Sequence, residues 1–330
     1  MDATLINKIR GVIYGHVIAD ALGLGTEFMS KEEISTYYPN GLRDYQQIIR
    51  KGHQGLWECG DWTDDTDQML CIVDSLLKHK SVMPRDIALR LYCWAQEGHP
   101  GIGATVFSVL FSRNFFSFES ALNPHLIAQQ VWEESGGECA ANGGIMRTSI
   151  LGIWDYLSPE KVIENAENVC KITHYDPRCV GSCVAVCLAI SSLLKGVSNI
   201  NNLIQDISSQ VSIYHPQISE YFDLAATGDL STLKLNGAGK IGYTLKAMGA
   251  GFWALQYAQS YEDGILQIIH EGGDADTNAA VAGGLLGAKF GFDHIPQKWV
   301  EGLLYQEELA SKTEAFINLL EEEMSSVVDG

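Results

Sequence analysis

Two clusters of carboxylate and hydroxyl residues, far apart in the chain, are the positions at which this sequence could do chemistry. The first, Gly60 to Asp67, holds four carboxylates and two hydroxyls within eight residues. The second, Glu271 to Asn278, adds three carboxylates and a threonine. Carboxylate and hydroxyl oxygens are ligands that hard divalent cations such as Mg²⁺ prefer. A pair of such ions can orient a substrate and activate water.

Each cluster alone is also typical of an ordinary helix N-terminus. Asp and Thr are favoured N-cap residues, acids in a first turn suit the helix dipole, and Asp65 with Gln68 could be a simple capping box. Two clusters together favour metal binding, because a cap needs one acid or hydroxyl, whereas five or more carboxylates would repel unless cations lie between them. This hypothesis requires the two helix starts to meet in space.

The elements that would position these residues are helices. Helix-like apolar spacing follows the first cluster from Met69 to Leu77 and the second from Ala279 to Phe290. A third helical pattern, Leu5 to Leu22, ends in Gly23-Leu24-Gly25, which is a glycine stop. Glu27 comes next. An acid at such a place is usually solvated, but the turn can also aim its carboxylate into a cleft.

Three glycine-rich loops are candidate ligand contacts. Gly98 to Thr105 resembles a backbone cradle for a phosphate, although a plain turn between helices explains it equally well. In Asn142 to Arg147 the glycines permit close backbone approach, and Arg147 could form either a charge-assisted ligand contact or a structural salt bridge. Gly237 to Tyr243 lacks the ending of a Walker motif. His174 lies at a helix junction, where a lone histidine is more often a cap or surface residue than a ligand contact.

The composition favours a soluble intracellular protein. The 330 residues are 46% hydrophobic, with 41 acids, 22 bases and a formal charge of −19. This balance argues against a nucleic-acid groove or an anionic membrane surface as partner. Eight cysteines without a Cys-x-x-Cys pair fit a reducing compartment. Met1 to Arg10 shows no signal-peptide core, and no apolar run is expected to reach about 18 residues, so we expect a cytoplasmic location and no membrane contact.

The predicted fold class is all-α, as one domain over residues 1–330. No stretch shows sustained strand alternation or a convincing hairpin, and there is no repeat or linker. Residues 30–60 carry turn signals and are expected to be an irregular loop, long enough for a lid or a cleft wall. Gly11, Gly15 and Ala19 form a small-residue strip that lets another helix approach closely. Further helices are expected over 84–96, 159–170, 180–194, 243–258 and 314–328.

Taken together, these motifs resemble the ADP-ribosylglycohydrolase family, which includes the dinitrogenase-reductase-activating glycohydrolases. The resemblance runs from about Ile9 to Phe290, and its motifs are specific as a set. The stretches that carry it are Gly15 to Glu27, Gly60 to Thr66, Asn142 to Arg147, Thr173-His174, and Glu271 to Thr277.

The resemblance implies an all-helical fold with a two-metal cleft holding Mg²⁺ or Mn²⁺. On the family pattern, Asp276 would bridge the two ions, and Glu27 or Asp65 would act as the catalytic acid or base. Gly144-Ile145 stands where many relatives carry alanines, which bears on finer substrate contacts. The implied metal ligands are Thr63, Asp64, Asp65, Asp274, Asp276 and Thr277, and the implied substrate-binding residues are Gly101, Gly103, Asn142, Gly143, Gly144, Met146, Arg147 and His174.

The activity implied is metal-dependent hydrolysis of the glycosidic bond between ADP-ribose and a modified Arg or Ser side chain, or a related conjugate. The expected partner is an ADP-ribosylated protein or a small ADP-ribose conjugate, bound by a monomer. Three alternatives stay open. One changes only the substrate within the family, to poly(ADP-ribose), O-acetyl-ADP-ribose or a modified nucleic-acid end. The others are an inactive ADP-ribose-binding or crystallin-like member of the same fold, and a phosphatase of the haloacid-dehalogenase type. The phosphatase fits only in part, because in Asp274-Ala275-Asp276-Thr277 the threonine comes one residue early and no apolar strand precedes it.

Overall fold

The computed structural model describes residues 1–237 and 239–328, and over them the fold is all-α, as predicted. The nearest approach to a sheet in this part of the chain is one isolated antiparallel bridge, Ala141 with Tyr243. The α-helices are α1 Ala3–Gly23, α2 Lys31–Tyr37, α3 Asp64–His79, α4 Pro84–Gln96, α5 Ala104–Leu110, α6 Phe118–Leu122, α7 Leu126–Glu134, α8 Pro159–Cys170, α9 Pro177–Leu194, α10 Ile200–Val211, α11 Gln217–Ala226, α12 Thr244–Tyr257, α13 Tyr261–Ile269, α14 Ala275–Phe290, α15 Gln297–Glu301 and α16 Gln306–Val328. The 3₁₀ turns are η1 Leu24–Thr26, η2 Tyr45–Gln47, η3 Gly52–Leu56, η4 Ile145–Arg147, η5 Ser149–Gly152, η6 Leu230–Leu233 and η7 Phe292–His294.

Helices α1 and α14 cross at the centre of the molecule with their backbones in contact. A Cβ added at Gly287 would lie 1.8 Å from the Gly11 carbonyl oxygen, and one at Gly283 would lie 2.1 Å from that of Gly15. Only glycine fits at such distances. Helix α1 leads to Glu27 and α14 begins in the second acidic cluster, so their close contact sets where these acids meet.

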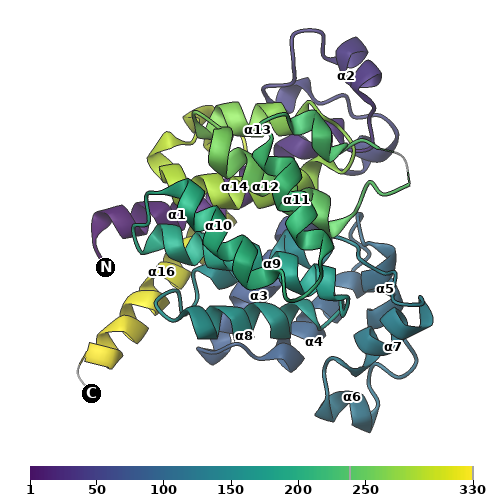
Figure 1. Ribbon diagram of the computed structural model, residues 1–330, viewed down its shortest axis with the longest axis vertical. Coiled ribbons are helices and arrows are strands. Elements are labelled where there is room, and N and C mark those ends of the chain that lie inside the picture. Colours follow the sequence, from purple (N-terminus) through teal and green to yellow (C-terminus); the bar gives the residue numbers. More distant parts are fainter. Residues whose placement is uncertain (238, 329–330) are drawn as a thin grey trace.

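The remaining helices surround this pair (Figure 1). In that view α12 and α13 lie with α14 in the upper half, α3, α4 and α8 lie below, and α5 to α7 form a lobe at the lower right. One large cluster of buried apolar side chains runs through nearly all of these helices. A separate small cluster, Val109, Ile127 and Ala128, joins α5 to α7.

Two expectations about particular segments were wrong. Residues 30–60 include a regular helix, α2, because Ser30 and Glu33 form a complete capping box at its start. Helix α9, within the described residues, is 18 residues long and apolar enough to cross a membrane by length and composition. However, 89% of that stretch is buried inside the fold, as in the core helix of a soluble protein.

Candidate active site

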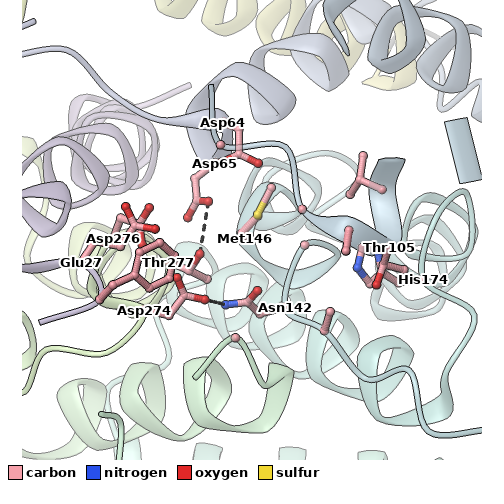
Figure 2. Close-up of a pocket in the computed structure, with 18 residues that line it drawn as sticks. Glu27, Asp64, Asp65, Thr105, Asn142, Met146, His174, Asp274, Asp276 and Thr277 are labelled. Atoms are coloured by element: carbon pink, nitrogen blue, oxygen red, sulfur yellow. Dashed lines mark hydrogen bonds between the residues drawn. The ribbon is translucent and has the colours of Figure 1, made fainter. Parts of the chain in front are cut away.

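The two acidic helix starts meet in space. Thr63 is the N-cap of α3 and Asp274 is the N-cap of α14. The Thr277 hydroxyl donates a hydrogen bond to Asp65 Oδ1 at 3.2 Å, although 212 positions separate the two residues. Figure 2 shows this bond between the two acidic segments. The geometric condition of the two-cluster hypothesis is therefore met.

Glu27 joins the second cluster. One carboxylate oxygen from each of Glu27, Asp274 and Asp276 lies within 4.8 Å of the others, an arrangement that could hold a metal ion. The chain after η1 is held there because the backbone N–H of Phe28 donates to the Gly273 carbonyl at 2.6 Å. The turn after helix α1 thus aims a carboxylate into the site, which is the less common of the two interpretations open from sequence.

The carboxylates of this site are buried close to one another. Burial raises the pKa of Asp64, Asp65 and Asp276 well above the usual aspartate value, and the neighbouring carboxylates raise it further. Burial likewise raises the pKa of Glu27 and Asp274, although hydrogen bonds oppose the shift at both. Desolvation and mutual repulsion both penalise the charged forms. Bound divalent cations would reverse this penalty.

The residues present fit such cations. Asp65 Oδ2 and Asp276 Oδ1 are buried and have no hydrogen-bond partner among the described residues. A buried charged oxygen left without a donor is costly, so one such oxygen in each of the two clusters calls for an external ligand. Carboxylate oxygens are the ligands that Mg²⁺ and Mn²⁺ share. The donor set therefore suits hard divalent cations.

Asp20, which sequence reasoning did not single out, accepts hydrogen bonds from the first cluster. Its carboxylate accepts hydrogen bonds from the backbone N–H and hydroxyl groups of Thr63 and Thr66, at 2.6 to 3.2 Å. Burial raises the pKa of Asp20 to about 7. An aspartate inside the apolar pattern of the first helix was the signal that could have found it. Asp20 fixes the start of α3 on α1.

A pocket of about 260 Å³ opens beside the acids. In Figure 2, Glu27, Asp274 and Asp276 gather at one side of it, and Thr105 and His174 lie at the other. The predicted site residues that line it are Glu27, Asp64, Asp65, Gly101, Gly103, Asn142, Gly143, Met146, His174, Asp274, Asp276 and Thr277.

Glycines in the loops let backbone approach these side chains. A Cβ at Gly101 would lie 2.5 Å from Asp64 Oδ1, and one at Gly143 would lie 2.8 Å from His174 Cε1. Asn142 donates to Asp274 Oδ2 at 2.6 Å and so links its loop to the second cluster. Burial, with Arg147 nearby, lowers the pKa of His174 to about 3, so its imidazole is neutral.

Three predicted residues lie outside the pocket lining. Thr63 turns its hydroxyl to Asp20, 2.8 Å away. Gly144 packs against Cys170 and His174. Arg147 is fully buried and donates to Gln68 and Thr173, and it makes no salt bridge with any described residue. Arg147 is fixed inside the fold by hydrogen bonds, next to the loop that lines the pocket.

Other lining or supporting residues were not predicted. Thr105, in the first turn of α5, and Gly242, in the loop before α12, line the pocket, and each belongs to a segment whose glycine content had been noted. His53 bonds to Glu27, and that bond raises the pKa of His53. No local pattern marked His53, because it lies in the segment expected to be irregular.

The comparisons with known proteins agree with this geometry. A family model described as ADP-ribosylglycohydrolase matches residues 1–326. The chain is 25% identical over 330 residues to the ADP-ribosylarginine hydrolase Tri1 of Serratia proteamaculans, covering 98% of this chain and 82% of that protein. It is 24% identical over 300 residues to the ADP-ribosyl-dinitrogen reductase glycohydrolase of Rhodospirillum rubrum, covering 90% of each.

A solved structure, an ADP-ribosylglycohydrolase-related protein complex, has the same fold. It superposes with a TM-score of 0.74 at 24% identity and covers 97% of this chain and 99% of its own. The family model and the relatives together place this fold in a class of hydrolases that cleave glycosidic bonds of ADP-ribose. The chain belongs to the ADP-ribosylglycohydrolase family.

Proposed function

We propose that this protein removes ADP-ribose from an arginine side chain of a modified protein, in a reaction that depends on Mg²⁺ or Mn²⁺. The observation that carries the proposal is the meeting of the two acidic helix starts beside one pocket. Arginine is favoured over serine because two relatives that the chain matches over nine tenths or more of its length are named ADP-ribosylarginine hydrolases.

The proposed cation ligands come from both helix starts, with Asp276 between them. Thr63, Asp64 and Asp65 would hold one ion, Asp274, Thr277 and Glu27 the other, and Asp276 both. When bound, the cations would supply positive charge beside the ribose hydroxyls and lower the pKa of an attacking water. Orphaned oxygens on Asp65 and Asp276 support their part in this set.

The side chains of the site would divide the remaining work. Cleavage of a ribosyl bond passes through an oxocarbenium-like state that nearby carboxylates stabilise. Glu27, with its raised pKa and a place at the pocket wall, would carry the proton at a carboxyl oxygen, and Asp65 is the alternative carrier. The neutral His174 and the loops at Gly101, Gly103 and Asn142 would orient the rest of the ligand.

Arg147 is assigned a supporting role in this proposal. Its guanidinium, bonded to Gln68, sits behind Asp64, because Gln68 in turn donates to Asp64 Oδ2 at 2.9 Å. It would hold the metal-binding acid in place rather than contact ADP-ribose.

A substrate panel tests the proposal. ADP-ribosylarginine, ADP-ribosylserine and O-acetyl-ADP-ribose would be incubated with the protein, with and without added Mg²⁺ or Mn²⁺, and free ADP-ribose measured. We expect metal-dependent release that is fastest from arginine. Faster release from serine would change the linkage assignment, and no release from any substrate would favour the inactive binding protein.

A further inference from the structure

The segment between α2 and α3 holds Glu27 at two points. His53 Nε2 lies 2.6 Å from Glu27 Oε2. Its neighbour Gln54 donates from Nε2 to the Glu27 backbone carbonyl at 2.8 Å. When Glu27 is ionised its carboxylate can only accept, so His53 then donates through Nε2–H, which even the neutral imidazole provides in the right tautomer. Consecutive residues of η3 thus fix both the side chain and the backbone of Glu27.

The His53 ring is itself restrained. It lies between two aromatic rings, with centroid distances of 4.9 Å to Phe28 and 4.9 Å to Trp57. Trp57 is buried, whereas Phe28 is exposed and stands at a φ of +60°, which non-glycine residues rarely adopt. The backbone bond of Phe28 to Gly273 holds this strained turn. These two ring contacts accompany the orientation in which the imidazole reaches Glu27.

Glu27 needs such a restraint. It is a long side chain, nearly fully buried, and its carboxylate lies within 4.8 Å of those of Asp274 and Asp276. Like charges at this separation repel, and rotation about three side-chain bonds would carry the carboxylate away. A donor behind Glu27 opposes that rotation. Partners of this kind behind a metal-binding group orient it and raise metal affinity.

We propose that His53 is a positioning residue that holds the Glu27 carboxylate against Asp274 and Asp276 and thereby strengthens divalent-cation binding at that end of the cleft. His53 does so through a hydrogen bond and is not itself a ligand. The inference rests on the proposed metal site.

Mn²⁺ binding to the purified full chain, followed by the electron paramagnetic resonance signal of the free ion, tests the inference. His53→Leu keeps the bulk of the side chain but removes the donor. We expect the Kd of the weaker of the two Mn²⁺ sites to rise about 10-fold or more, as metal affinity does when a partner behind a ligand is lost. His53→Gln places an N–H where Nε2 stood and should stay within about 3-fold of wild type. If His53→Leu does not fold, His53→Asn takes its place in the test. Its side chain is too short to reach Glu27, so we expect the same rise in Kd.

A double-mutant cycle separates positioning from general structural damage. In a Glu27→Gln background, His53→Leu should change the Kd no further, because the carboxylate that it positions is gone. Unchanged binding in His53→Leu, or an equal loss in both backgrounds, would overturn the inference. Absence of Mn²⁺ binding to the wild-type protein would instead refute the proposed metal site, so the two failures are distinguishable.

Discussion

At the scale of single residues, the site is a set of carboxylates whose burial is unfavourable without cations. Asp276 combines a raised pKa, caused first by burial and then by Glu27 and Asp274, with an orphaned buried oxygen. Such residues are kept for function at a cost in stability. Substitutions that remove a buried charge should therefore have opposite effects on activity and on the stability of the metal-free protein.

Asp276→Asn is the sharpest case. We expect turnover to fall about 10²-fold or more, since one electrostatic contact to the transition state is lost. We also expect the metal-free Tm to equal or exceed that of wild type, because a repelled charge is removed without changing shape. Helical circular dichroism should be nearly unchanged. Turnover close to wild type would refute the bridging role.

His16 links stability to pH. It is fully buried in α1, and burial lowers its pKa from 6.5 to about 4. Between these values the unfolded chain binds the proton and the folded chain does not, so the contribution of His16 is complete above pH 6.5 and is lost as the pH falls. The loss at pH 5 is about 2 kcal/mol relative to pH 8.

Urea unfolding of His16→Gln and wild type at pH 8 and pH 5 measures this effect. The acid-induced loss of unfolding free energy should be smaller in the variant by about 2 kcal/mol. His294→Gln, at an exposed histidine, is the matched control and should follow wild type. Identical losses in all three proteins would contradict the assignment to His16.

At the scale of elements, the crossing of α1 and α14 positions the site. Asp20 and Glu27 lie at or just beyond the end of α1, and Asp274 and Asp276 lie at the start of α14. The glycines at the crossing, Gly11 and Gly287 among them, set the separation of these helices. A wider crossing would move the two groups of acids apart.

Gly287→Ala tests this element directly. Its Cβ would meet the Gly11 carbonyl oxygen at 1.8 Å, so the helices must separate, and we expect a loss of about 2–3 kcal/mol in unfolding free energy. Gly284→Ala adds the same methyl group to the same helix, where the nearest atom is Ser149 Cβ at 3.3 Å. That control should cost less than about 1 kcal/mol. Equal losses in urea unfolding would contradict the backbone-contact explanation.

At the scale of the whole molecule, bound cations would link segments that are distant in the sequence. The first cluster belongs to α3, and the second to α14, so an ion held by both links the two sides of the cleft. Ligands that bind only the folded state stabilise it by mass action.

Metal removal should therefore affect stability as well as activity. We expect EDTA to stop hydrolysis and to lower the Tm, and Mg²⁺ or Mn²⁺ to restore both. At a cation concentration of 100 times Kd the stabilisation is about 2.7 kcal/mol. Asp276→Asn, which lacks the shared ligand, should show a smaller shift. Turnover and Tm that are indifferent to chelator would exclude the two-metal mechanism.

Much of the helical structure could be predicted because its signals are local. The expected bounds 84–96 and 159–170 coincide with α4 and α8, where a proline occupies the first turn of each helix. The short helix α2 was missed because its pattern is brief and its capping box lies among turn residues. For Arg147 both a ligand contact and a salt bridge stayed open, since the chain gives no hint that Gln68 and Thr173 surround its guanidinium.

The sequence by itself determined the residue types at the site, the helices that begin there and the need of the acids for a counter-charge. Those properties follow from side-chain chemistry and from periodicity over a few turns. Only the tertiary structure decided that Asp65 and Thr277 meet, that His53 reaches Glu27 and that Arg147 turns inward. Each of these depends on tertiary packing, which brings together residues that no short-range pattern connects.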